Sequence, residues 1–272
     1  MSTVDEETTT FEARLQSDFD GPFNFNVGAI KIDSEVTTNY YVFANGLEAA
    51  LTGTNAVAGS IVLPADRSYF QSRSPVTLDA LGIFGEGYWD VTDDFKITLG
   101  LRYTDDDKEQ LVTPTLLLSP EGLPEEQGVY ERSAPQQAKF EEITGRFGFD
   151  WQTSILPWSD DSLIYAFYSR GYKGGGINPP QASGLGSVDD AFDPEFINAY
   201  EIGTKSTILN GAGFLNLTAF YYDYEGYQIS NIINRTALNV NVDAEVTGLE
   251  AEFFAQLTDS FAVNASLGLL DT

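Results

Sequence analysis

The sequence predicts an all-β chain: an antiparallel transmembrane β-barrel segment of about ten long strands, with short periplasmic turns and long extracellular loops. Three observations support this fold class. Apolar and polar residues alternate with a period of two along most of the chain, short turns alternate with long polar loops, and aromatic residues make up 13% of the sequence. Outer-membrane barrels combine these loop lengths with aromatic girdles at both membrane interfaces. The short turns, expected on the periplasmic side, lie near residues 20, 93, 159, 211 and 259.

The first half of the chain supplies five expected strands. A hairpin over residues 10–19 and 23–41 turns at Asp20-Gly21-Pro22, and a polar stretch from Phe43 to Val76 is expected to be a loop. The strand from Phe95 to Tyr103 alternates most regularly and leads to the acidic run Asp105-Asp106-Asp107. The other expected strands cover residues 81–91 and 143–152.

The second half contains a strand over residues 163–172 and then a long hairpin over residues 192–230. Asn210-Gly211 supplies its tight turn, because Asn and Gly tolerate the positive φ that such a turn requires. On its first arm Tyr200, Ile202 and Thr204 alternate with polar residues on the other face. Two further strands are expected over residues 247–257 and 261–270, so the chain ends within a strand.

Composition excludes several classes of function. The net charge is −27, which repels phosphate backbones and disfavours a nucleic-acid partner. The chain has no cysteine and no histidine, which removes thiolate and histidine metal sites and the Ser-His-Asp and Cys-His catalytic arrangements. No enzyme, metal site or cofactor is predicted. No apolar run is long enough for a transmembrane helix, and the first residues lack the basic and apolar regions of a signal peptide. An outer-membrane protein must carry a signal peptide, so the chain is expected to be an internal fragment if it belongs to such a protein.

Alternation divides the strands into an apolar and a polar face, and two folds fit it. In a soluble sandwich the apolar face is the core, whereas in a membrane barrel it meets lipid and the polar face lines the lumen. A lipid-facing Arg or Lys costs about 2–4 kcal/mol at the midplane, and the apolar stripes avoid charge. The residues expected to face the lumen are Arg14, Glu86, Arg102, Arg146, Glu201, Lys205, Glu250 and Glu252.

Several motifs resemble the barrel domain of TonB-dependent outer-membrane receptors. They are Leu99-Gly100-Leu101-Arg102-Tyr103-Thr104, Ser169-Arg170-Gly171-Tyr172-Lys173-x-Gly175-Gly176, Tyr200-Glu201-x-Gly203-x-Lys205, Ala219-Phe220-Tyr221-Tyr222-x-Tyr224 and Val246-x-Gly248-Leu249-Glu250. They occur in a consistent order over nearly the whole chain. The resemblance implies that residues 1–272 are a partial barrel domain that lacks the plug domain and the C-terminal strands of a wall of about 22 strands.

The resemblance also implies location and partners. Such a receptor lies in the bacterial outer membrane and takes up a scarce nutrient, most often a ferric siderophore, in a TonB-dependent way. Its partners would be outer-membrane lipid and lipopolysaccharide, its own plug domain, the TonB complex through that plug, and the nutrient. Two alternatives stay open, a passive porin-like channel and a soluble β-sandwich binding module.

Arg170, Tyr172 and Lys173 are the candidate ligand-binding residues. They lie where a strand rises into an expected extracellular loop, and an anionic ferric complex would use cationic and aromatic donors there. The alternative is an ordinary structural role in the wall and rim. The acidic runs 105–107 and 189–190 could bind Ca²⁺ but do not match a spaced calcium loop, so solvated loop tips are the alternative. Glu250 and Glu252 share one face of a strand, and lumen lining accounts for them without catalysis.

Overall fold

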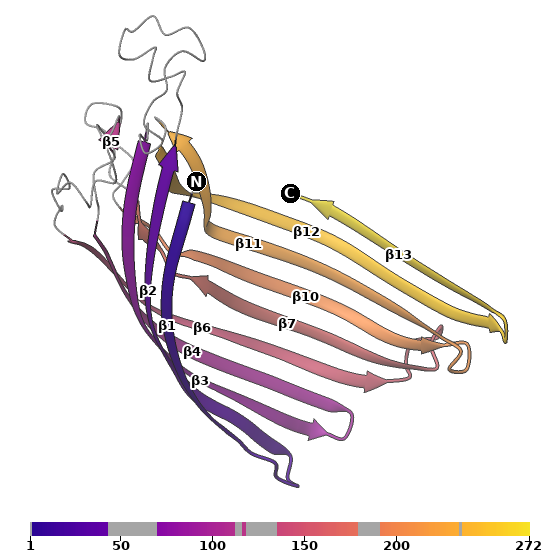
Figure 1. Cartoon of the computed structure of the whole chain (residues 1–272). Coiled ribbons are helices and arrows are strands. Elements are labelled where there is room, and N and C mark those ends of the chain that lie inside the picture. Colours follow the sequence, from indigo (N-terminus) through magenta and orange to yellow (C-terminus); the bar gives the residue numbers. More distant parts are fainter. Residues whose placement is uncertain (1, 43–69, 112–115, 118–134, 179–190, 234–235) are drawn as a thin grey trace, which may run out of the picture.

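The structure, a computed structural model, describes residues 2–42, 70–111, 116–117, 135–178, 191–233 and 236–272. Figure 1 shows these residues as one curved sheet whose long strands lie side by side in chain order. The main strands are β1 (Ser2–Gln16), β2 (Phe23–Val42), β3 (Phe70–Thr92), β4 (Phe95–Leu111), β6 (Pro135–Thr153), β7 (Asp161–Lys173), β10 (Glu195–Ile208), β11 (Gly213–Ile233), β12 (Thr236–Thr258) and β13 (Phe261–Asp271). Within the described residues, no helix is long and apolar enough to cross a membrane.

Every pairing in the main sheet is antiparallel. The strands follow the order β1-β2-β3-β4-β6-β7-β10-β11-β12-β13, and the two-residue β5 (Leu116–Leu117) pairs with β3. A second small sheet joins β8 (Gly176–Ile177) to β9 (Ala191–Phe192). The predicted all-β, antiparallel fold class is therefore confirmed.

The short turns lie together along one end of the sheet, at the lower right of Figure 1. At the turn between β10 and β11, Asn210 and Gly211 have φ values of 55° and 85°, as the sequence predicts, and Leu209 also has a positive φ of 59°. The backbone amide of Ala212 donates to the carbonyl of Leu209 at 3.3 Å and closes this turn.

The strands extend further towards the other end than expected. β1 begins at Ser2 instead of Thr10, and β3 begins at Phe70, inside the stretch expected to be a loop. The acidic run 105–107 belongs to β4, where Asp106 pairs with Ala80 on β3 and with Phe140 on β6. The interpretation of this run as a loop tip was wrong, because a backbone ladder can continue where both sheet faces are polar. The second acidic run, 189–190, lies outside the described residues.

The ladder register defines two faces. The apolar face carries Leu99, Leu101, Ile202, Leu217 and Leu249, and these side chains are open to the surroundings: Leu101 is 60% and Leu249 56% exposed. In the described part of the chain, the only buried hydrophobic residues are Ala80, Ile208, Leu238 and Ala255. The sheet therefore has no apolar core of its own, which disfavours the soluble sandwich.

Aromatic side chains border the apolar face at two levels. Near the short turns lie Trp89, Trp151 and the pair Phe95–Phe149, whose ring centroids are 5.6 Å apart. Towards the loops lies a tyrosine row across three strands, in which Tyr200 is 5.0 Å from Tyr168 and 6.2 Å from Tyr221 between ring centroids.

Between the two aromatic levels the apolar face carries no charged residue among those described, and we call this zone the apolar band. On β4 the band covers the nine residues from Phe95 to Tyr103, close to the roughly 9–11 residues of a membrane-spanning strand. The first charges beyond the band on the same face are Lys31, Asp79, Asp105, Glu141, Arg170, Asp223 and Glu245.

Candidate functional site

The polar face brings together all eight residues that the sequence assigns to the lumen side. The register connects them across neighbouring strands, since Gly100 pairs with both Glu86 and Arg146, and Glu201 pairs with Phe220, which pairs in turn with Gly248 beside Glu250. The shared face follows from the register. The assignment of this face to a lumen stays a prediction.

Glycines on the polar face leave room for long side chains from neighbouring strands. Arg146 on β6 crosses Gly100 and approaches Glu86 on β3, with Nε 2.9 Å from Oε1. A Cβ at Gly100 would lie only 3.2 Å from Cγ of Arg146 and 3.6 Å from Cγ of Glu86. Phe84 and Phe220 cover Gly28 and Gly248 in the same way. Large side chains therefore lie flat along this face.

Of the eight residues, the four on the C-terminal strands are the acids Glu201, Glu250 and Glu252 and the base Lys205. Tyr165 on β7 donates its hydroxyl to Glu201 at 2.8 Å, and the ammonium of Lys205 lies 5.8 Å from the centroid of the Tyr165 ring. Glu252 accepts a hydrogen bond from the Asn216 amide at 3.3 Å. This arrangement can bind polar groups, but it contains no nucleophile positioned by a base.

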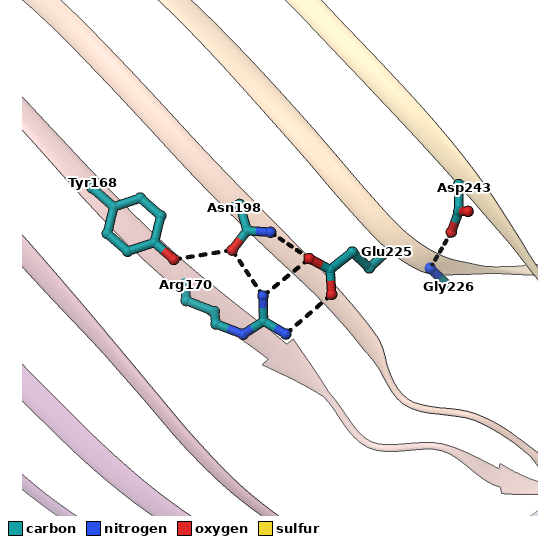
Figure 2. Close-up of polar contacts among 6 residues, drawn as sticks. All are labelled: Tyr168, Arg170, Asn198, Glu225, Gly226 and Asp243. Atoms are coloured by element: carbon teal, nitrogen blue, oxygen red, sulfur yellow. Dashed lines mark hydrogen bonds and ion pairs between the residues drawn. The ribbon is translucent and has the colours of Figure 1, made fainter.

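Arg170 is held in the wall by a network on the loop side of the tyrosine row (Figure 2). Its Nη1 donates to Oδ1 of Asn198 at 2.8 Å, and its two terminal nitrogens donate to the carboxylate of Glu225 at 3.3 and 3.2 Å. Its guanidinium carbon lies 4.3 Å from the centroid of the Phe196 ring. Asn198 is 8% exposed, accepts also from the Tyr168 hydroxyl at 3.0 Å and donates to Glu225 at 2.7 Å.

Tyr172 and Lys173 have separate partners. The Tyr172 hydroxyl donates to Oδ2 of Asp106 on β4 at 3.0 Å, and Lys173 donates to Glu195 on β10 at 3.4 Å. Arg170 and Lys173 point to opposite faces of β7, because successive residues of a strand alternate. The three candidate residues therefore do not converge on one point, and each contacts the wall. Their role in ligand binding stays a prediction.

Sequence reasoning missed a polar junction at the loop-side end of β10. Gln228 on β11 donates its amide to the carbonyls of Gly174 and Asp193 at 3.1 and 3.2 Å. Asn241 on β12 donates to the carbonyls of Asp193 and Gly226 at 2.9 and 2.7 Å. The two chain segments that leave β7 and enter β10 are thus both fixed to the β11–β12 hairpin.

The junction coincides with a β-bulge on β11. The register shifts between Tyr224 and Tyr227, and Gly226 has a φ of 66°. Its amide donates to Oδ1 of Asp243 at 3.0 Å, as Figure 2 shows. The sequence signal that could have found this bulge is a glycine that interrupts an otherwise regular aromatic alternation.

Acidic side chains do not gather into a metal site in the described part of the chain, where no group of three or more is arranged to hold an ion. Two members of the run 105–107 have other partners. Asp105 lies 3.5 Å from the ammonium of Lys139, and Asp106 accepts from Tyr172.

A family model described as TonB dependent receptor-like, beta-barrel, matches residues 2–271. Among solved structures, the chain is similar to the ferric yersiniabactin uptake receptor FyuA from Yersinia pestis, with a TM-score of 0.71 and 17% identity over 99% of this chain and 36% of that one. The copper transporter OprC gives a TM-score of 0.68 and 16% identity over 99% of this chain and 38% of that one.

A third similar structure is the ferripyoverdine receptor of the outer membrane of Pseudomonas aeruginosa, with a TM-score of 0.56 and 18% identity over 99% of this chain and 33% of that one. The chain therefore spans about a third of the length of these structures. No curated protein matches the sequence.

Proposed function

This chain belongs to the family of TonB-dependent receptor β-barrels, and we propose that residues 1–272 form part of the barrel wall of a receptor that takes up a ferric siderophore. The family is one of outer-membrane receptors, which agrees with the predicted localisation and with the prediction that the chain is not an enzyme. The match shows the family, and the proposal concerns the substrate and the partners of the whole receptor.

The apolar band is the observation that carries the proposal. It is open on one face, free of charge among the described residues and bordered by aromatic side chains at both levels. Exposed apolar surface of this extent is stable only against another apolar phase. Lipid would contact this band, and lipopolysaccharide would contact the charged residues on its loop side.

The polar face supports the second part of the proposal. Its charges include both signs and lie on wall strands rather than on loops, as expected for a wall against a polar domain or a hydrated lumen. A plug domain would lie against it, and the TonB complex would act through that plug. The alternative is a passive porin, and an uptake measurement with and without TonB distinguishes it from a TonB-dependent receptor.

The substrate class rests on resemblance. Of the three similar structures, two are named as receptors for ferric yersiniabactin and for ferripyoverdine, and the other is named as a copper transporter. In such folds the loops determine which substrate binds, so the residues of the wall do not identify the iron complex.

The test is uptake of radioactive iron by the source bacterium, supplied as a panel of ferric siderophores under iron limitation. Deletion of the gene for the intact polypeptide should abolish uptake of one complex, and inactivation of TonB should abolish it equally. Uptake that persists without TonB would identify a passive channel. Uptake of every ferric complex unchanged by the deletion would contradict the substrate assignment.

A further inference from the structure

A groove of about 540 Å³ crosses the apolar band from β10 to β13. The ladder register places its lining residues in two neighbouring rows. The row nearer the loops is Ile202, Ala219, Leu249 and Leu269, and the row nearer the short turns is Thr204, Leu217, Ala251 and Leu267. The small side chains Thr204, Ala219 and Ala251 are diagonal neighbours across β10, β11 and β12, and together they leave a depression among the larger ones.

The floor of this groove presents hydrocarbon and no unpaired polar group among the described residues. The hydroxyl of Thr204 lies 2.8 Å from Oγ of Ser206, which in turn accepts a hydrogen bond from Ser162 at 2.8 Å. Glu250 borders the groove through its backbone, because its side chain lies on the polar face. An apolar occupant therefore leaves no buried polar atom without a partner.

The groove begins at the membrane interface on the short-turn side. Leu156 and Trp158, in the turn between β6 and β7, line that end. On β10, Thr204 lies midway between Tyr200 of the tyrosine row and Ile208 at the end of the strand. The groove therefore extends from the short-turn interface to about the middle of the apolar band, and the tyrosine row separates it from the loop side.

Trp158 has the character of an interfacial residue. Its side chain is 42% exposed, and among the described residues no acceptor lies within hydrogen-bond distance of its indole N–H. Tryptophan is enriched where a membrane changes from hydrocarbon to head groups, because its ring is apolar and its N–H is a donor. Here that donor lies at the mouth of an apolar groove, where the ester carbonyl of a lipid would accept from it.

We propose that the groove binds one acyl chain of a phospholipid from the leaflet on the short-turn side, the periplasmic leaflet of the outer membrane. A cavity of about 150 Å³ holds benzene, so about 540 Å³ has room for at most roughly twenty carbons, which is one chain. The chains of lipopolysaccharide enter from the loop side, across the tyrosine row. This inference rests on the proposed function, because only a wall within a membrane presents the band to lipid.

Contact packing, and not the hydrophobic effect, would hold the chain. A bilayer already surrounds every acyl chain with hydrocarbon, so a chain gains nothing by leaving water. In the groove it contacts the floor and both rows of larger side chains at once, whereas on a flat part of the band it contacts protein on one side only. Filling the groove with a protein side chain should therefore release the lipid and leave the rest of the band unaffected.

The test is native mass spectrometry of the intact receptor, extracted from the outer membrane in a mild detergent. Ala219→Phe and Ala251→Phe each fill part of the floor. Ala166→Phe is the matched control, because Ala166 lies on the same face and in the same row as Ala219, two strands away on β7, and does not line the groove. Thermal unfolding in detergent checks that each variant is folded.

The native receptor and Ala166→Phe should retain one phospholipid. The two filling variants should retain it about tenfold less, as expected from the loss of roughly ten atom contacts. The site is refuted if the native receptor retains no phospholipid, or if the filling variants retain it as well as the control does. Retention of lipopolysaccharide that is lost on filling would overturn the assignment to a phospholipid.

A second measurement needs no substitution in the groove. The native receptor is placed in phosphatidylethanolamine vesicles that contain a trace of the same lipid with a diazirine on one acyl chain. Light should label the peptides that contain Trp158 and Ala219 more strongly than the β3 and β4 peptides of the same apolar band. Equal labelling along the band would show ordinary bilayer contact and no site.

Siderophore uptake by the native receptor separates this proposal from the proposed function. TonB-dependent uptake by a receptor that retains no phospholipid would remove only the lipid site. Absence of TonB-dependent uptake would remove the proposed function, and the two lipid measurements would still decide whether the groove binds an acyl chain.

Discussion

Replacing Asn198 with alanine is expected to destabilise the receptor by about 2–3 kcal/mol. The buried amide accepts from Tyr168 and Arg170 and donates to Glu225. Two of these hydrogen bonds involve a charged partner, and such bonds contribute about 1.5–3 kcal/mol each, against about 0.5–1.5 kcal/mol for the neutral one. The sum is reduced because Arg170 and Glu225 still bind each other through two contacts in the variant.

The measurement is the free energy of unfolding of the intact receptor in lipid vesicles, followed by tryptophan fluorescence in urea. Asn231→Ala is the matched control, because Asn231 is an exposed asparagine on β11. It should change the free energy of unfolding by less than about 0.5 kcal/mol. A similar cost for both variants, or a cost for Asn198→Ala within the error of zero, would show that the network around Arg170 does not stabilise the wall.

Three further changes test other parts of the structure by the same measurement. Leu249→Arg places a charge in the apolar band and should lower the free energy of unfolding in a bilayer by about 2–4 kcal/mol. Glu250→Arg, on the polar face of the same strand, should lower it far less. Equal losses would contradict the assignment of the two faces. Gly226→Ala should cost about 1–2 kcal/mol because its φ is 66° and its Cβ would lie 3.0 Å from the Pro194 carbonyl oxygen, while Gly268→Ala has open space and should cost nothing. Hydrogen bonds from Arg170 and then Asn198 hold the pKa of the Glu225 carboxyl, which lies on the loop side of the tyrosine row, below its usual value. The ionised Glu225 carboxylate therefore stabilises the folded receptor above the unfolded pKa of about 4.3, and this contribution is lost as pH falls through the lower folded pKa. The difference in free energy of unfolding between the native receptor and Glu225→Gln should shrink from pH 7 to pH 3. A constant difference would exclude this carboxylate as the cause.

Sequence alone predicts the features that depend on local alternation. Residues that are two apart share a face, so the polar set from Arg14 to Glu252 could be assigned before any strand was paired. The turn at Asn210-Gly211 follows from local φ preferences in the same way. Alternation gives no signal where both faces are polar, and for that reason the loop-side halves of β1, β3 and β4 were missed.

The network around Arg170 could not be predicted, because it depends on the register between distant strands. Asn198 and Glu225 are 28 and 55 residues from Arg170 in sequence, and they meet only because β7, β10 and β11 are adjacent. A shift of one residue in either ladder would move these partners to the other face. The ligand contact that the sequence suggests at Arg170 stays a prediction, and the structure adds the partners of this side chain within the wall.

The junction at Gln228 and Asn241 fixes both ends of the connection between β7 and β10 to the β11–β12 hairpin. The carbonyls of Gly174 and Asp193 are both tied to the neighbouring hairpin, and Asn178, which lies between them in sequence, exchanges hydrogen bonds of 3.0 and 2.8 Å with the backbone of Asn239 on β12. A slip of β7 against β10 would have to break these hydrogen bonds, so the junction holds the register of the two strands at their loop-side end.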